Sequence, residues 1–363
     1  MGGVILFDAI AHQPAAVTTL RRAHAGGRLA HAHLFWGPEG VGKTRTALAL
    51  AQAIFCTETP APCGACADCR RVQRLAHADL HLVLPAVRAE AGEPGAELAA
   101  YVQDPLACLR LPRLATIGIE RVRGLKLESA KAGVARDRRV IVLREAERMT
   151  PEAAQAALKL IEEPRPGTFL LLTADDPSHL LPTIISRCQQ TRFRPLPLEF
   201  IAEVLAERFS LAAGTARMVA GLAQGSLSRA QGLAEADAAR LRDRMVELFE
   251  APAPDAGEVA RRVAALGASW TPDRARTASD LLMTWYGDLV ALQQGLDPAG
   301  RVHADRLEDL RRSAAQLPVS EIRRRMTLLE EMLEAIEQNV NPALALQAML
   351  LRLHRLIGED PVF

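Results

Sequence analysis

One run of residues near the start of the chain has the types and spacing needed to hold phosphate groups. It fits the pattern G-x-x-x-x-G-K-[ST], in which glycines let backbone N–H groups converge on phosphate oxygens and the lysine reaches the β- and γ-phosphates. The terminal threonine can ligate Mg²⁺. The run consists of Gly37, Pro38, Glu39, Gly40, Val41, Gly42, Lys43 and Thr44. The sequence therefore predicts a nucleotide-binding loop with ATP and Mg²⁺ as its ligands.

The segments on either side of this loop are those that the pattern requires. The apolar run Leu34 to Trp36 predicts a strand that stops at Gly37, and apolar residues from Ala47 to Ile54 recur at helical spacing. A helix that begins at the loop presents its N-terminus to the phosphates, which favours their negative charge. This context distinguishes a phosphate-binding loop from a chance match.

A second cluster consists of four cysteines within fourteen residues. They are Cys56, Cys63, Cys66 and Cys69. In a reducing compartment, thiols at this spacing indicate a metal site rather than disulfides. Four thiolates form the tetrahedral set of a structural zinc site, which is closed and takes no part in catalysis. The alternatives are an iron–sulfur cluster and thiols without a metal.

The other cysteines and the nearby histidines are expected to be structural. Cys108 and Cys188 stand apart from the cluster, and a free cysteine commonly behaves as a small buried apolar residue. We expect three histidines to be surface or core residues rather than zinc ligands: His31, His77 and His81. The predicted zinc site therefore has four sulfur ligands.

ATP hydrolysis needs acidic residues at the end of a further apolar strand. The predicted strand Val140 to Leu143 is followed by Arg144 and Glu145. An arginine thus stands where a metal-holding aspartate is expected, so Mg²⁺ is held less well, while Glu145 keeps the position from which it can orient the attacking water. The alternative is that Glu145 is only a solvated residue at the strand end. We expect a site that binds nucleotide and turns it over slowly or not at all.

An arginine further along the chain is a candidate for action on a neighbouring subunit. Arg187 lies in a Ser-Arg-Cys run that follows LLPTII, close after the predicted strand Phe169 to Leu172. A guanidinium group presents a fixed charged fork to phosphate, so Arg187 is a candidate arginine finger in trans. The alternative is that it caps a helix.

The composition is that of a globular protein with little excess charge. Of 363 residues, 49% are apolar and 24% are charged, and 44 Lys and Arg stand against 43 Asp and Glu. This balance excludes the bulk positive field of many free-standing DNA binders, so any contact with DNA is local or shared with partners. The sequence shows no secretion signal and no run of about 18 apolar residues, so we expect a cytoplasmic protein without membrane contact.

The chain is long enough for two or three domains. Three continuous apolar strands alternate with helices, which predicts an α/β domain with a buried parallel sheet over residues 1–195, with the cysteine module at 56–69 inserted in it. Strand patterns then disappear, so a small helical domain is expected at 196–233 and a second at 234–363. Residues 85–112 are interpreted as a surface insertion without chemistry.

One helix of the last third has a continuous apolar face. Its apolar side chains recur at spacings of three and four: Ile322, Met326, Leu329, Leu333 and Ile336. The face either forms the core of a helix bundle or packs in part against neighbouring subunits.

Four segments, taken together, resemble the bacterial clamp-loader family, the delta-prime and gamma/tau subunits of DNA polymerase III. They are GRLAHAHLFWGPEGVGKT, the cysteine module, AALKLIEEP and LLPTIISRCQQTRFRPL. The resemblance covers residues 5–230 well and the remaining helices more loosely. It implies an AAA+ protein with a RecA-like ATPase core that carries the zinc module, a helical lid, and a helical collar that assembles a pentamer.

The resemblance also implies partners and roles. The pentamer of this family opens the sliding clamp and places it on primed DNA, so the expected partners are the gamma/tau and delta subunits and, through the complex, the clamp and DNA. Arg187 is then the finger in trans, and a polar sensor falls at Thr173 or Asp175. The sequence has no paired carboxylates arranged for two-metal nucleotidyl transfer, so no polymerase active site is expected.

Three features favour a delta-prime subunit over the gamma/tau motor. Arg144 stands where the motor has an acidic residue. The run LLPTIISRC resembles the delta-prime sequence pattern rather than that of the motor. The chain stops at residue 363 without a long tail. Arg229 in GSLSRA lies one position from the motor's sensor arginine, so we do not expect it to touch the chain's own nucleotide. ATPase activity is expected to be weak or absent. The alternatives are an active gamma/tau-type motor and a general AAA+ helicase or remodeller.

Overall fold

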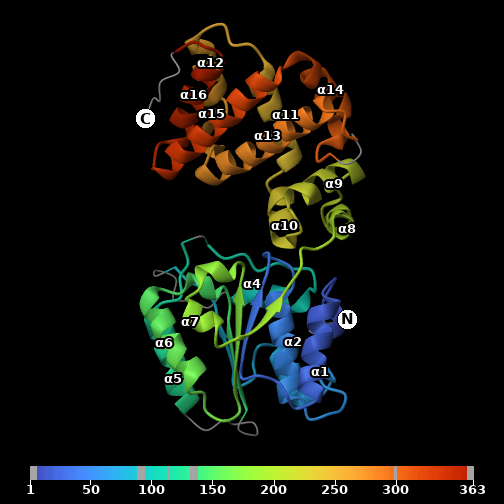
Figure 1. Ribbon diagram of the computed structural model, residues 1–363, viewed down its shortest axis with the longest axis vertical. Coiled ribbons are helices and arrows are strands. Elements are labelled where there is room, and N and C mark those ends of the chain that lie inside the picture. The colour runs from blue at the N-terminus through green and yellow to red at the C-terminus, as the bar shows by residue number, and fades with distance from the viewer. Residues whose placement is uncertain (1–5, 88–94, 113, 131–137, 298–300, 358–363) are drawn as a thin grey trace. The chain divides into compact units, whose positions relative to one another are not determined.

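The structure is a computed structural model that describes most of the chain. The described residues are 6–87, 95–112, 114–130, 138–297 and 301–357. They form two compact units, of which the first is Met1–Pro197 with Gly225–Ser228 and the second is Leu198–Gln224 with Arg229–Phe363 (Figure 1). The first unit is α/β and the second is helical, so the predicted fold class is confirmed. The further division of the helical part between residues 233 and 234 stays a prediction.

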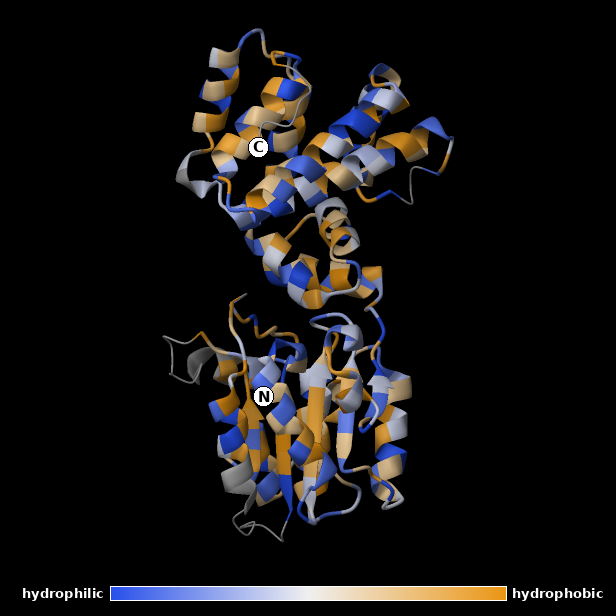
Figure 2. Cartoon of the chain, turned by 60° about the vertical axis from the view of Figure 1, so that its left-hand side comes forward, coloured by the Kyte–Doolittle hydropathy of each residue, from blue (hydrophilic) through white to orange (hydrophobic). Residues whose placement is uncertain are grey.

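A five-stranded parallel sheet forms the centre of the first unit. The strand order is β2-β3-β4-β1-β5. The strands are β1 Ala32–Trp36, β2 Leu80–Val83, β3 Arg139–Leu143, β4 Thr168–Ala174 and β5 Gln189–Arg192. Strands β1 and β3 are buried almost throughout, and the inner strands are largely orange in Figure 2, as expected of a parallel sheet covered on both faces.

The three apolar strands predicted from the sequence correspond to β1, β3 and β4, and this prediction is confirmed. The two edge strands were not predicted. Strand β5, Gln189–Arg192, consists of polar and mostly exposed residues, so it carries no apolar run. It is a strand because its backbone pairs in parallel with β1, with His33 opposite Gln189 and Trp36 opposite Arg192.

Helices cover both faces of the sheet. In Figure 1, α1 and α2 lie on one face, and α5 and α6 lie on the other. The helices of this unit are α1 Pro14–Ala25, α2 Lys43–Phe55, α3 Ala67–Gln73, α4 Gly95–Gln103, α5 Ile119–Ala130, α6 Pro151–Glu162 and α7 Pro182–Ile185. Helix α6 begins as predicted, with Pro151 in its first turn and Thr150 accepting a hydrogen bond from the Ala153 N–H group, so its N-terminus is fixed locally.

The interpretation of residues 85–112 as a surface insertion is wrong for the part that the structure describes, whereas the absence of chemistry in this segment stays a prediction. Residues 88–94 lie outside the described residues. Helix α4 occupies Gly95–Gln103, and the side chains of Tyr101, Val102 and Leu109 are buried. The Gly, Pro and Glu residues at the start of the segment are typical of a surface loop. The sequence interpretation therefore overlooked the apolar residues that follow them. This segment covers part of α2, as described below.

The second unit consists of helices that pack around α13. The helices are α8 Leu198–Phe209, α9 Ala213–Leu222, α11 Ala238–Glu250, α12 Ala256–Ala264, α13 Pro272–Gln293, α14 Leu307–Gln316, α15 Val319–Glu337 and α16 Pro342–Leu353. Helix α10, Leu227–Glu235, begins in residues of the first unit. Trp285 and Tyr286 of α13 are fully buried where α11, α14 and α15 pack against it. Among the described residues, no helix has the length and apolar character to cross a membrane.

The apolar face predicted in the last third lies on α15. Ile322, Leu329 and Ile336 are buried, whereas Met326 and Leu333 are only half-buried. Helix α15 packs against α13 and α16. The bundle-core interpretation is therefore confirmed for the three buried residues of this face.

The ion pair between Arg242 of α11 and Asp305 gives a test of packing in the helical unit. Arg242 is 2% exposed, and its Nη1 donates to both Asp305 carboxylate oxygens at 2.7 and 2.8 Å. Replacing Arg242 with alanine leaves Asp305 without its partner, so we expect a loss of about 3–5 kcal/mol in the free energy of unfolding. Chemical denaturation of the full chain, followed by circular dichroism, measures this loss.

The matched control is Arg217→Ala. Arg217 pairs with Glu199 at 2.5 Å on the surface, where an ion pair contributes less than about 1 kcal/mol. Equal losses for the two variants would contradict the expected difference between a buried and an exposed pair.

Candidate nucleotide-binding loop and four-cysteine site

The loop between β1 and α2 has a backbone that only glycine fits at two positions. Gly37 and Gly40 have φ values of +143° and +75°. A Cβ atom at Gly37 would lie 2.3 Å from the Phe193 carbonyl oxygen, and one at Gly40 would lie 2.4 Å from the Ser228 backbone nitrogen. Both approaches are too close for any side chain. The loop therefore depends on glycine to pass these two segments.

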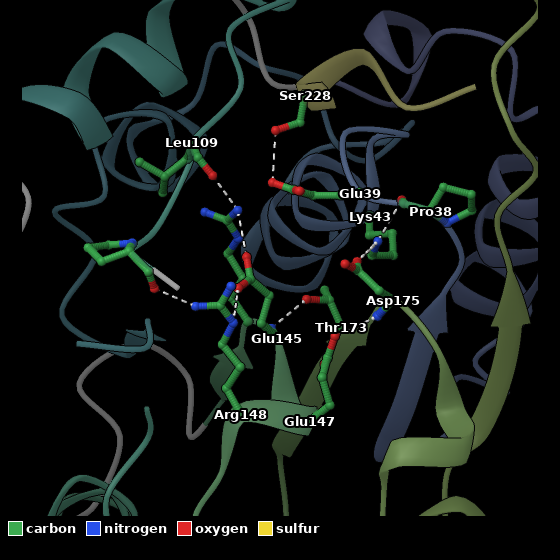
Figure 3. A network of polar contacts seen from close by, with 12 residues as sticks. Pro38, Glu39, Lys43, Leu109, Glu145, Glu147, Arg148, Thr173, Asp175 and Ser228 are labelled. Carbon is green, nitrogen blue, oxygen red and sulfur yellow. Dashed lines mark hydrogen bonds and ion pairs between the residues drawn. The ribbon is translucent and has the colours of Figure 1, made fainter. Parts of the chain in front are cut away.

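Lys43 is the first residue of α2, and its ammonium group has three acceptors. Its Nζ donates to the Gly37 carbonyl oxygen at 2.5 Å. It also donates to the Pro38 carbonyl oxygen and to Asp175 Oδ1, both at 2.7 Å (Figure 3). An ammonium group has three donors, so all of them are used. Asp175 directly follows β4, the neighbour of β1 in the sheet, which explains why it reaches the loop lysine. A phosphate group bound here would replace some of these acceptors.

Thr44 is buried next to a tyrosine that the sequence did not single out. Its side chain forms a hydrogen bond with the Tyr101 side chain, and burial raises the pKa of Tyr101, so this phenol stays neutral. The Arg45 guanidinium lies 4.3 Å from the centre of the Tyr101 ring. Arg45 also donates to the carbonyl oxygens of Tyr101 at 2.6 Å and of Ala107 at 3.2 Å. The segment 95–110 is thus fixed against the first turn of α2.

Glu145 is held between two arginines at the end of β3. Arg144 Nη2 lies 2.8 Å from Glu145 Oε1, and Arg148 Nε lies 2.9 Å from Glu145 Oε2 (Figure 3 labels Glu145 and Arg148). Glu145 is 6% exposed, so the alternative of a solvated strand-end residue is wrong. Burial raises the pKa of Glu145, and the charges of Arg144 and Arg148 oppose this rise. Its backbone N–H donates to Thr173 Oγ1 at 3.0 Å.

Glu147 is a further acidic residue at this edge of the sheet. Its Oε1 accepts a hydrogen bond from the Asp175 backbone N–H at 2.8 Å (Figure 3). Burial raises the pKa of Glu147. No sequence pattern indicates this role, because Glu147 follows the strand end by four residues and its partner is distant in the chain. Glu147 fixes the backbone that presents Asp175 to Lys43.

Arg187 lies two residues after the end of the short helix α7. Its Nε pairs with Glu162 Oε1 of α6 at 2.8 Å, and its side chain is 41% exposed. Its Nη1 donates to the Thr183 carbonyl oxygen of α7 at 3.2 Å, a contact that agrees with the helix-cap alternative. These contacts do not bring Arg187 to the chain's own nucleotide loop. Arg229 pairs with Asp280 of α13 at 2.7 Å.

The four cysteines of the predicted metal site come together. Their sulfur atoms all lie within 4.8 Å of one another, and Cys63 Sγ and Cys69 Sγ are 3.9 Å apart. A tetrahedron of thiolates at about 2.3 Å from zinc has sulfur–sulfur edges of about 3.8 Å, so the cluster fits this metal. Cys56 follows the last residue of α2, and Cys66 is the N-cap residue of α3. The site would therefore join these two helices.

Backbone N–H groups favour the charged form of one of these thiols. The Cys63 sulfur accepts from the N–H groups of Ala65 and Cys66 at 3.4 and 3.3 Å. These hydrogen bonds lower the pKa of Cys63 to about 7, which favours the thiolate that binds a metal. Among the described residues, the cluster contains no histidine or carboxylate. The donor set is therefore sulfur alone.

The histidines and lone cysteines have structural surroundings. His77 is buried and its ring stacks on Phe55 at 3.8 Å, while His31 Nε2 forms a hydrogen bond with the Ile161 carbonyl oxygen. These surroundings agree with the expected structural role, and among the described residues the group of possible metal ligands consists of the four cysteines. Cys188 is buried as expected, whereas Cys108 is only partly buried.

The sheet and the loop define the class of the protein. A parallel sheet with a glycine-rich loop between β1 and α2, followed by helices, is the architecture of the predicted AAA+ fold class. The family described as "DNA polymerase III, delta subunit" matches residues 12–197, and the family described as "DNA polymerase III, delta subunit, C terminal" matches residues 258–355. The chain belongs to the DNA polymerase III delta-subunit family. The predicted resemblance is confirmed.

Similar proteins carry the name of the delta-prime subunit or of its relatives. The chain is 27% identical over 335 residues to DNA polymerase III subunit delta' of Bacillus subtilis, which covers 91% of this chain and 92% of that protein. It is 37% identical over 193 residues to the subunit delta' of Pseudomonas aeruginosa, which covers 50% of each chain. It is 29% identical to subunit tau of Escherichia coli over 63% of this chain and 32% of that protein.

Removal of one sulfur ligand tests the four-cysteine site. Cys69 is buried in the cluster, so Cys69→Ser is expected to abolish stoichiometric zinc in the purified protein and to lower its melting temperature. Metal analysis and thermal unfolding measure the two effects. Cys108→Ser is the control, because Cys108 lies outside the cluster and should leave the zinc content unchanged. Iron in place of zinc, or no metal in the wild type, would contradict the zinc assignment.

Proposed function

We propose that the chain is the delta-prime subunit of a DNA polymerase III clamp loader and takes part in loading the sliding clamp onto primed DNA. Family membership carries this proposal, because the matches cover both the α/β unit and most of the helical unit. The delta-prime relative of Bacillus subtilis aligns over 92% of its own length, whereas the tau relative of Escherichia coli aligns over 32%. The proposed partners are the gamma/tau and delta subunits.

Within this complex we propose that the loop Gly37 to Thr44 binds ATP and turns it over slowly. The loop has the glycines and the lysine that phosphate binding needs. Hydrolysis also needs a carboxylate that can orient water or take its proton. Both oxygens of Glu145 are already paired with arginines, which supports a binding site with little activity of its own.

The second part of the proposal is that Arg187 completes the ATP site of a neighbouring subunit. Arg187 and its partner Glu162 are 41% and 43% exposed. An exposed ion pair is worth little, so the guanidinium can exchange Glu162 for a phosphate group at low cost. This exposed position just after α7 supports action in trans. The four cysteines would hold a structural zinc ion between α2 and α3, apart from the nucleotide chemistry.

The second candidate function is a gamma/tau-type motor, and the intact loop favours it. In that case Glu145 would orient the water and the isolated chain would hydrolyse ATP. The two candidates therefore differ in the effect of neutralising Glu145, which distinguishes them without any partner subunit.

Nucleotide binding and turnover by the purified chain test the first part. We expect ATP binding that is lost in Lys43→Ala, and little hydrolysis, which Glu145→Gln leaves unchanged because Arg144 and Arg148 already neutralise this carboxylate. Binding by calorimetry and phosphate release measure these properties. Lys159→Ala is the control, since Lys159 is an exposed lysine outside the loop. Robust turnover that falls more than about tenfold in Glu145→Gln would establish the motor instead.

The role of Arg187 is tested in the complex reconstituted with gamma/tau and delta. Arg187→Ala is expected to lower DNA-stimulated ATP hydrolysis by more than about tenfold, on the scale of arginine-finger effects. Arg194→Ala is the matched control, because Arg194 is another exposed arginine of the same unit. Size-exclusion chromatography establishes that both variants assemble. Unchanged ATP hydrolysis in an assembled Arg187→Ala complex would contradict the proposed role of Arg187 at the neighbouring ATP site.

A further inference from the structure

The residues around the nucleotide loop do not match the requirements of a bound Mg²⁺ ion. Mg²⁺ binds oxygen ligands in a near-ideal octahedron and usually takes one or two carboxylates besides phosphate and water. In P-loop proteins the protein ligands are the hydroxyl of the loop threonine or serine and an aspartate at the end of a strand. In this chain those two positions are Thr44 and Arg144.

The Thr44 hydroxyl already has a partner within the protein. It forms a hydrogen bond with Tyr101, a buried phenol. Tyr101 is held in turn by Arg45, whose guanidinium lies over its ring at 4.3 Å and donates to its carbonyl oxygen at 2.6 Å. A metal ion at Thr44 would have to share this hydroxyl with the buried tyrosine beside it.

Arg144 places a fixed positive charge where a metal-holding carboxylate is expected. Its side chain is buried, and its Nη2 donates to the Leu109 carbonyl oxygen and pairs with Glu145. Among the described residues, Arg144 Nη1 is buried without a hydrogen-bond partner. A buried guanidinium N–H without an acceptor is costly, and a phosphate oxygen is an acceptor that fits it.

The other acidic groups at this edge are also engaged. Glu145 pairs with two arginines, and Asp175 accepts from Lys43. Glu39 Oε1 accepts from the Ser228 hydroxyl at 2.8 Å (Figure 3). Glu147 Oε1 accepts from the Asp175 backbone N–H, while its Oε2 is buried without a hydrogen-bond partner in the described part of the chain. Burial raises the pKa of Glu147, which disfavours the charged form that binds a cation. These groups offer no free pair of carboxylates for a divalent ion.

We propose that this loop binds a nucleoside triphosphate without Mg²⁺, and that Arg144 supplies through Nη1 the positive charge that the metal supplies in a motor subunit. The inference rests on the proposed binding of ATP by the loop. It explains why an intact loop lies next to a residue that repels a metal ion. A nucleotide bound in this way is a structural ligand, since the cation that polarises the transferred phosphoryl group in hydrolysis is not required.

The test compares the affinity of the full-length chain for ATP in excess Mg²⁺ and in excess EDTA. Isothermal titration calorimetry is expected to give dissociation constants that agree within about threefold. If the chain binds ATP in Mg²⁺ but more than about tenfold more weakly in EDTA, the inference is overturned while the proposed function stands. If ATP binds in neither buffer, the inference and the nucleotide-binding part of the proposed function both fail.

Variants of Arg144 identify the group responsible. Arg144→Ala is expected to weaken binding in EDTA by more than about tenfold, whereas Arg110→Ala, an exposed arginine near the same segment, should leave it unchanged. The double variant Arg144→Asp with Tyr101→Phe restores a carboxylate and frees Thr44, so its binding is expected to require Mg²⁺. Circular dichroism and melting curves establish that each variant is folded. Unchanged binding by a folded Arg144→Ala variant would exclude the role of Arg144.

Discussion

The parallel pairing of the strands is the constraint on which the rest of this site depends. Because β1, β3 and β4 run in the same direction, their carboxyl ends meet at one edge of the sheet. The glycine-rich loop follows β1, Arg144 follows β3, and Asp175 follows β4. Residues more than a hundred positions apart, such as Lys43 and Asp175, thereby become neighbours at 2.7 Å.

On the proposed function, the electrostatic balance at this edge would separate nucleotide binding from ATP hydrolysis. Arginines neutralise Glu145 on both of its oxygens, and the loop lysine is neutralised by Asp175. A free catalytic carboxylate near bound phosphates would repel them, whereas a paired one does not. On the proposed function, these pairs would suit the edge to holding a nucleotide and would occupy the carboxylate that could activate water. This arrangement suits a subunit whose proposed contribution to hydrolysis is an arginine offered to its neighbour.

The cysteine module depends on a different, local kind of interaction. The four thiols lie within one short stretch of chain, and hydrogen bonds from the backbone to the sulfurs already shape the turn between α2 and α3. A metal ion would add a link at the end of α2 opposite to the nucleotide loop. The loop and the module therefore share one helix, with Lys43 at its beginning and Cys56 immediately after its end.

The sequence alone determined the features that depend on near neighbours. Residue spacing predicted the loop from Gly37 to Thr44 and the cluster of four cysteines. Helix capping predicted the start of α6 at Pro151, and apolar runs predicted three strands. Only the tertiary structure decided the partners of these residues. Tyr101 lies against Thr44, two arginines hold Glu145, and the polar strand β5 joins the sheet. Such contacts depend on how distant segments of the chain pack together. A local sequence pattern does not specify which distant residues will contact it.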